Sequence, residues 1–182
     1  NQTHLHGVAY DLWSGRFWFC IGDLTYKGQY YSDNNGATWT EVPRHASVHL
    51  DRFQATTITA TRHGMVLGSD DGVHNGMARI LRTQNPQDQR VELIWRWPHR
   101  EVSIRGFAFK GVRDKAGMVY IGFRTDRDYA KPIITWSDGL VGGLLYEYEG
   151  EHTANDAIRN IAPIGDGIRA WVSRSAHPNE SI

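Results

Sequence analysis

The stretch Tyr31-Ser32-Asp33-Asn34-Asn35-Gly36-Ala37-Thr38-Trp39 decides how the fold of this chain is interpreted. It places a polar turn between two runs with strand character, 28–32 and 38–42. A short polar side chain at Asp33 or Asn34 can cap backbone amides in such a turn, and Gly36 can adopt the positive φ that the turn requires. The stretch therefore predicts a tight connection between two β-strands, the second beginning near Trp39.

Outward from this turn, the chain repeats the same order of strand-like runs about every 50 residues, a period typical of repeat architectures. The runs fall at 5–11, 16–23, 28–32 and 38–42, then at 53–60, 64–70, 76–81 and 91–97, then at 103–109, 117–123, 132–136 and 143–148, and finally at 158–163 and 167–173. No helical periodicity separates them. We therefore predict an all-β chain of four-stranded antiparallel units.

The recurrence of this order favours a β-propeller over a β-sandwich, because a sandwich gives no reason for the same four-strand order to return. We expect a single domain over 1–182, with blades at about 4–43, 52–98 and 102–149 and an incomplete one at 157–182. About three and a half blades leave faces without a neighbour. Further chain segments or subunits are therefore expected to complete the ring, and the alternative is a small four-bladed propeller with an irregular last blade.

Composition excludes several functional classes. The 20 Lys and Arg residues balance the 20 Asp and Glu residues, so no basic excess favours nucleic acid as a partner. No apolar run is long enough for a membrane span. The single cysteine, Cys20, cannot form an internal disulfide and is expected to be a small buried apolar residue on a strand.

The stretch quoted first resembles the Asp-box, or bacterial neuraminidase repeat, of sialidases and related propellers. Ser32, Gly36, Thr38 and Trp39 match its pattern, whereas Asn34 stands at the central Asp position and Asp33 one place earlier. The stretch 135–139 resembles a degenerate second copy of this box. The resemblance implies a structural box on the side of the blade away from the ligand, with Trp39 packed under the turn.

The opening stretch 4–11, together with Gly22-Asp23 and the box, is similar to propeller domains of bacteriophage minor tail proteins. This weaker resemblance implies an extracellular or virion-associated protein that binds a glycan or a cell-surface receptor.

By analogy with propellers, ligands meet the rim where first strands begin and second strands end. The residues expected there are His4, His6, Asp23, Tyr26, Arg52, Gln54, Asp70, Asp71, Arg105, Arg124, Asp126, Tyr129 and Arg159. Arginines of this set could grip a carboxylate, and Tyr26 and Tyr129 could stack on sugars. Trp13 is placed on the opposite side. His4, His6 and Asp23 could hold a metal ion, but we expect a hydrogen-bonded lining with no metal or cofactor.

Three functions remain open at this stage. The first is a carbohydrate- or receptor-binding module. The second is a sialidase-like exo-glycosidase, for which Asp23, Asp70 and Arg105 are the candidate catalytic residues. The third is a structural or assembly propeller without a small ligand.

Overall fold

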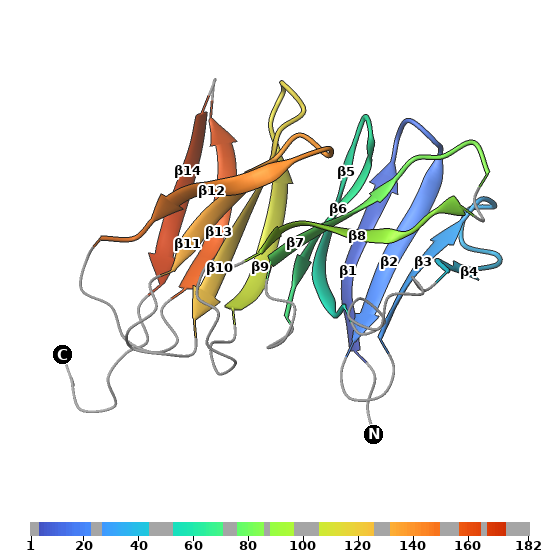
Figure 1. The fold of residues 1–182 in the computed structure, drawn as a ribbon, viewed down its shortest axis with the longest axis horizontal. Helices are drawn as coiled ribbons and strands as arrows, with labels where there is room; N and C mark the ends of the chain where they lie inside the picture. Colours follow the sequence, from blue (N-terminus) through green and yellow to red (C-terminus); the bar gives the residue numbers. More distant parts are fainter. Residues whose placement is uncertain are drawn as a thin grey trace.

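The computed structural model describes residues 4–22, 27–43, 53–70, 76–85, 88–96, 106–125, 132–149, 157–164 and 167–173, and these residues form β-strands and turns without an α-helix (Figure 1). The strands are β1 (His4–Asp11), β2 (Arg16–Gly22), β3 (Gly28–Ser32), β4 (Thr40–Glu41), β5 (Ala55–Thr61), β6 (Gly64–Ser69), β7 (Gly76–Leu81), β8 (Val91–Arg96), β9 (Gly106–Arg113), β10 (Val119–Thr125), β11 (Ile133–Ser137), β12 (Gly142–Glu147), β13 (Ala157–Ile164) and β14 (Gly167–Ser173). In the described ranges no helix is long and apolar enough to cross a membrane.

Within each group of four strands, every strand pairs antiparallel with the next one in the chain, which gives three four-stranded units. The first sheet is β1–β4, the second is β5–β8 and the third is β9–β12. A fourth unit, the hairpin β13–β14, is hydrogen-bonded to the third sheet through the pairing of Arg124 in β10 with Ala157 in β13, which extends that sheet to six strands. The all-β class and the four-stranded antiparallel sheets are thus confirmed.

The first strand of the third sheet ends later than expected. The sequence favoured 103–109, whereas β9 spans Gly106–Arg113. The reason is the turn that follows, in which the Asp114 amide donates to the Met118 carbonyl at 2.9 Å and brings Arg113 opposite Val119. This register draws Lys110, Gly111 and Arg113 into the strand despite their polar or flexible character.

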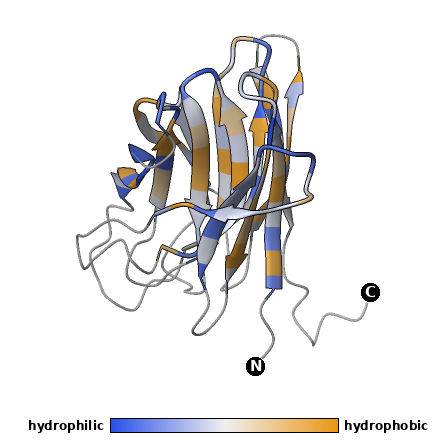
Figure 2. Cartoon of the chain, turned by 90° about the vertical axis from the view of Figure 1, so that its right-hand side faces the viewer, coloured by the Kyte–Doolittle hydropathy of each residue, from blue (hydrophilic) through white to orange (hydrophobic). Residues whose placement is uncertain are grey.

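The sheets stack through their first strands, because β1 contacts β5, β5 contacts β9 and β9 contacts β13. Apolar side chains fill the spaces between neighbouring sheets. One cluster joins the first and second sheets, a second joins the second and third, and a third joins the third sheet to the β13–β14 hairpin. Figure 2 shows hydrophobic residues along the strands of this stack.

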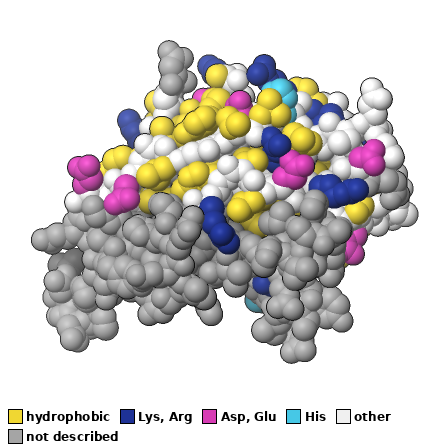
Figure 3. All heavy atoms as spheres, in the orientation of Figure 1, with side chains coloured by type: hydrophobic (Ala, Val, Ile, Leu, Met, Phe, Trp, Pro, Cys, Tyr) yellow, Lys and Arg dark blue, Asp and Glu magenta, His cyan; other side chains and the backbone are white. Residues whose placement is uncertain are grey.

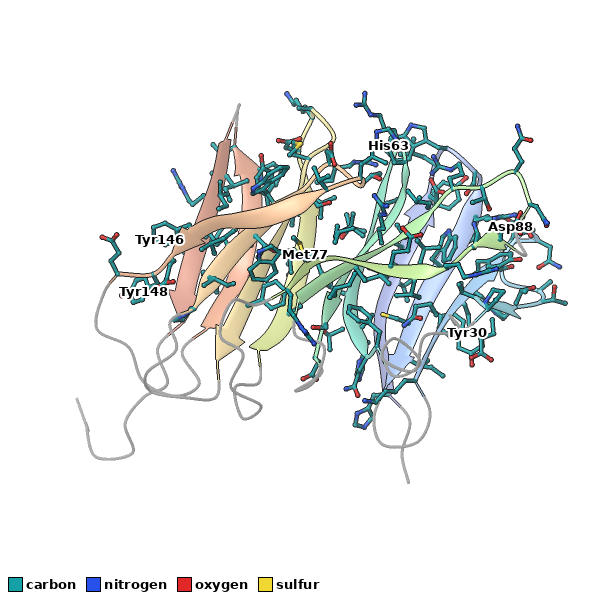
Figure 4. The ribbon with its side chains drawn as sticks, in the orientation of Figure 1. Tyr30, His63, Met77, Asp88, Tyr146 and Tyr148 are labelled. Carbon is teal, nitrogen blue, oxygen red and sulfur yellow. The ribbon has the colours of Figure 1, made fainter. Side chains whose placement is uncertain are left out.

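Strand β6 shows how the alternation of side chains builds two of these cores at once. Met65 and Leu67 belong to the cluster shared with the first sheet, whereas Val66 belongs to the cluster shared with the third. On the neighbouring strand Met77, labelled in Figure 4, also faces the third sheet, where its Sδ lies 3.0 Å from Thr135 Oγ1. Both faces of the second sheet are therefore buried.

Every first strand carries a β-bulge, an extra residue with no partner on the second strand. The extra residues are His6, Thr56, Phe109 and Arg159. Two of them bond to the next sheet in the same way, since His6 Nδ1 donates to the Ala55 carbonyl at 3.1 Å and Thr56 Oγ1 donates to the Ala108 carbonyl at 2.6 Å. The bulges align the four units residue by residue.

Small residues on the second strands allow this close stacking. A Cβ added at Gly68 would lie 2.5 Å from Ala108 Cβ, and one added at Gly122 would lie 2.6 Å from the Ile158 carbonyl oxygen. The bulge alignment places Cys20 at the equivalent position of the first sheet, where it is fully buried as expected. Burial raises the pKa of the Cys20 thiol to about 12, so this cysteine is unreactive in the folded protein.

Candidate ligand-binding site

Polar side chains of the first two sheets gather where first strands begin and second strands end. His4 and His6 open β1, Gln54 directly precedes β5, and Asp70 directly follows β6. The rings of His4 and His6 lie 6.3 Å apart between centroids. These four residues are the predicted rim residues whose side chains the structure describes.

Gly22, the last residue of β2, lets the two sheets bring these side chains together. A Cβ at this position would lie 2.5 Å from His6 Cε1 and 2.9 Å from Gln54 Cγ. Because a carbonyl oxygen only accepts, the bond from His6 Nδ1 to the Ala55 carbonyl places a proton on Nδ1. The imidazole thus has a fixed orientation across the boundary between the sheets.

Gln54 and Asp70 form the second half of this site. The Asp70 amide donates to the Gln54 carbonyl at 2.8 Å, and Gln54 Nε2 lies 3.5 Å from Asp70 Oδ2. Gln54 is buried and Asp70 is partly exposed. The backbone bond closes the end of the β5–β6 pair and holds the Asp70 carboxylate beside Gln54, where it can accept hydrogen bonds from a ligand.

The other predicted rim residues divide into two groups. Arg124 pairs across β9–β10 with Phe107 and across β10–β13 with Ala157, and Arg159 is the bulge residue of β13; the structure describes only the backbone of these two arginines. The remaining candidates lie outside the described residues, and they are Asp23, Tyr26, Arg52, Asp71, Arg105, Asp126 and Tyr129.

The catalytic and metal hypotheses therefore rest largely on undescribed positions. Of the catalytic candidates Asp23, Asp70 and Arg105, Asp70 alone lies within the described ranges. Among the residues whose structure is described, no three His, Cys, Asp or Glu side chains come together closely enough to hold a metal ion.

The turn between β3 and β4 lies at the opposite end of the strands, since Ser32 pairs with Phe17 near the start of β2. Ser32 Oγ accepts from the Gly36 amide at 2.8 Å, and Asn34 Oδ1 accepts from the Thr38 amide at 2.8 Å. Asn34 is thus the capping residue, while Asp33 points outward to an ion pair with Arg16 at 2.5 Å.

The backbone and the last tryptophan complete this turn. Gly36 has a φ of 87° and Asn35 one of 58°. The Trp39 ring meets Phe19 edge-on at 4.5 Å between centroids, and its Cζ2 would lie 3.5 Å from a Cβ at Gly36. Trp39 is the residue before β4, which starts at Thr40. The hydrogen-bonding groups of this turn are directed inward, as a structural role requires.

The turn between β11 and β12 is closed by similar bonds. Ser137 Oγ accepts from the Gly139 amide at 3.0 Å, and Asp138 Oδ1 accepts from the amides of Leu140 and Val141 at 2.8 and 2.9 Å. The pKa of Asp138 lies below its usual value mainly because its carboxylate accepts the hydrogen bond from the Val141 amide. This turn too uses its polar atoms internally.

A cluster that the sequence did not predict lies at the β1–β2 turn. Asp11 is buried and binds Arg82 Nη2 at 2.7 Å through both carboxylate oxygens. The Trp13 ring has the guanidinium of Arg113 4.5 Å from its centroid and that of Arg82 5.7 Å away. The cluster joins the first sheet to residues from the second and third. Asp11 and Arg82 are 71 residues apart in the sequence, so no local pattern could identify them as partners.

Comparisons of this chain with protein families, with curated proteins and with solved structures gave no match.

Proposed function

We propose that this chain is a glycan-binding module of the β-propeller type, whose ligand meets the end where first strands begin. The observation that carries the proposal is the meeting of His6 and Gln54 from two sheets over Gly22, with His4 near His6 and Asp70 beside Gln54. At the opposite end the turns at Ser32 and Ser137 direct their polar atoms into their own backbone.

Two features support a blade arrangement for the sheets. The first strand of each sheet contacts the first strand of the next, as the innermost strands of a propeller do. The bulge recurs at the same register position in all four units, which makes them equivalent repeats.

The chemistry of the converging side chains suits a sugar. Hydroxyl groups both donate and accept, and the site offers imidazole, amide and carboxylate groups that supply both roles. His4 is exposed and Asp70 partly exposed, so a ligand can reach them without opening the sheets. On the strength of the resemblance to phage tail propellers, we place this binding activity outside the cell or on a virion.

A glycan array with matched variants tests the proposal. Asp70→Asn removes a charge at the proposed site, whereas Asp33→Asn makes the same change at the other end of the strands. Hydrogen bonds to charged groups contribute about 1.5–3 kcal/mol, so Asp70→Asn should weaken glycan binding at least about tenfold. His4→Ala should also weaken it, and Asp33→Asn should leave it unchanged.

Three results would overturn the proposal. Binding to no glycan, or equal loss of binding in Asp70→Asn and Asp33→Asn, removes the proposed site. Turnover of fluorogenic glycosides that disappears in Asp70→Asn would show a hydrolase instead of a binding module.

A further inference from the structure

The outer face of the first sheet is apolar and exposed. Leu5, Val8 and Tyr10 on β1 are 62%, 60% and 53% exposed. Aromatic side chains extend this surface across the sheet, since Tyr10 packs against Phe17 at 4.9 Å and Phe19 stacks on Tyr30 at 4.9 Å. We call this surface the head face. Exposed apolar and aromatic side chains gathered on one surface are typical of interaction surfaces.

The bulges show what the head face corresponds to in the other units. Leu5 directly precedes its bulge, as Ala55, Ala108 and Ile158 precede theirs, and all three of these equivalents are buried against the preceding sheet.

The next position of β1 on the head face follows the same rule. Val8 lies two residues after its bulge, and its equivalents Ile58 and Ile161 are buried in the cores shared with the preceding sheet. The head face thus has the positions by which each later unit packs on the one before it.

The opposite end of the stack carries the complementary surface. Trp171 on β14 pairs with Asn160, the residue after the bulge. Trp171 is therefore equivalent to Gly68 and Gly122, which face the next sheet in the internal interfaces. Trp171 is 47% exposed, and Ile164, at the end of β13, is exposed as well. We call this surface the tail face.

We propose that the head face of one molecule binds the tail face of a second copy of this chain. Each internal interface joins a surface equivalent to the tail face with a surface equivalent to the head face. In the described part of the chain, the head face of the first sheet and the tail face of the β13–β14 hairpin stay exposed. A head-to-tail contact continues this series of interfaces and buries both apolar surfaces, and it produces a ring where the rotation closes and a filament where it does not.

The side chains at this contact are larger than those inside the stack. Trp171 replaces the cysteine and glycines of the three preceding units, and Leu5 replaces alanine at two equivalent positions. The strands of the two copies are therefore expected to lie further apart than within the chain, with the contact made by side chains. Buried aromatic anchors of this kind carry much of the binding energy in protein interfaces.

The contact is tested by light scattering after size-exclusion chromatography, without any glycan. Tyr10→Lys disrupts the head face and Trp171→Lys the tail face. The matched control is Tyr146→Lys, which changes an exposed tyrosine on β12 (Figure 4). None of the residues that define the head face or the tail face lies on this strand, and Figure 3 shows other apolar side chains on the broad face towards the viewer.

The wild-type chain and Tyr146→Lys should associate as their concentration rises, and Tyr10→Lys and Trp171→Lys should each remain monomeric. A mixture of Tyr10→Lys with Trp171→Lys should form a one-to-one dimer, because each supplies the face that the other lacks. Circular dichroism on each variant establishes that it is folded.

Three outcomes would overturn the proposal. A wild-type chain that stays monomeric at its highest soluble concentration has no such contact. Association that survives Trp171→Lys but not Tyr10→Lys indicates a head-to-head pair, and failure of the mixture to recombine excludes complementary faces. None of these outcomes bears on glycan binding, which has its own variants.

Discussion

Replacing Asp11 by asparagine should destabilise the contact between the first and second sheets. The Asp11 side chain is 3% exposed and that of Arg82 is 25% exposed. The carboxylate also accepts from Ser14 Oγ at 2.6 Å and from the Trp13 amide at 3.1 Å. Asp11→Asn removes the charge and keeps the volume, so Arg82 loses its counter-ion in a largely dry environment.

The magnitude follows from the burial of the pair. Breaking a buried ion pair costs about 3–5 kcal/mol of unfolding free energy. Arg82 retains some contact with solvent and with the Thr61 carbonyl at 3.2 Å, so we expect a loss near the lower end, about 3 kcal/mol. Arg82→Met should cost a similar amount, and a double-mutant cycle should give a coupling energy of about 1–3 kcal/mol.

Urea denaturation measures these free energies, and a second ion pair supplies the control. Arg79 and Glu92 lie 2.9 Å apart, but Glu92 is 42% exposed, so Glu92→Gln should cost less than about 1 kcal/mol. Equal losses for Asp11→Asn and Glu92→Gln would refute the reasoning. They would mean that burial of the Asp11–Arg82 pair adds nothing to the packing of the first two sheets.

Three further predictions follow from local geometry. Burial raises the pKa of Cys20 from 9.0 to about 12, so in this pH range the folded state keeps a proton that the unfolded state loses. Relative to Cys20→Ala, the unfolding free energy of the wild type should therefore fall by about 1.4 kcal/mol per pH unit above about pH 9. Urea midpoints at about pH 8 and about pH 10.5 would reveal this fall. Gly68→Val should cost about 1–3 kcal/mol or more through overpacking against Ala108, whereas Gly167→Ala, with its nearest neighbour 3.9 Å away, should have little effect on the melting temperature. Asn34→Ala should lower the unfolding free energy by about 1 kcal/mol because it removes the cap on the Thr38 amide. Asp33→Ala, at an exposed ion pair, should change it by less than half of that. Equal effects of the two substitutions would contradict the assignment of the cap to Asn34.

The strands could be predicted from the sequence because their signal is local. Alternating β-branched and aromatic residues between glycine-rich turns identified 16–23 and 64–70 to within a residue or so of β2 and β6. The end of β9 could not be predicted in this way. Lys110 and Gly111 are poor strand formers, and they extend because the Asp114–Met118 turn sets their register.

The bulges were not visible in the sequence because they have no shared chemistry. Histidine, threonine, phenylalanine and arginine occupy the four bulge positions. What recurs is a backbone arrangement, and it becomes apparent only when both strands of each pair are known. The same limit applies to Asp11 and Arg82, which the stacking of sheets brings together from distant parts of the chain.

The candidate site depends on that stacking because it is built from two sheets. His6 comes from the first sheet, Gln54 and Asp70 flank strands of the second, and the bond from His6 to the Ala55 carbonyl crosses the boundary. A ligand that contacts His4 or His6 together with Asp70 can bind only while the two sheets are packed. By linkage it must therefore stabilise their contact. A glycan that binds here should raise the unfolding midpoint of Gly68→Val as well as that of the wild type, even though residue 68 faces the third sheet and lies outside the site.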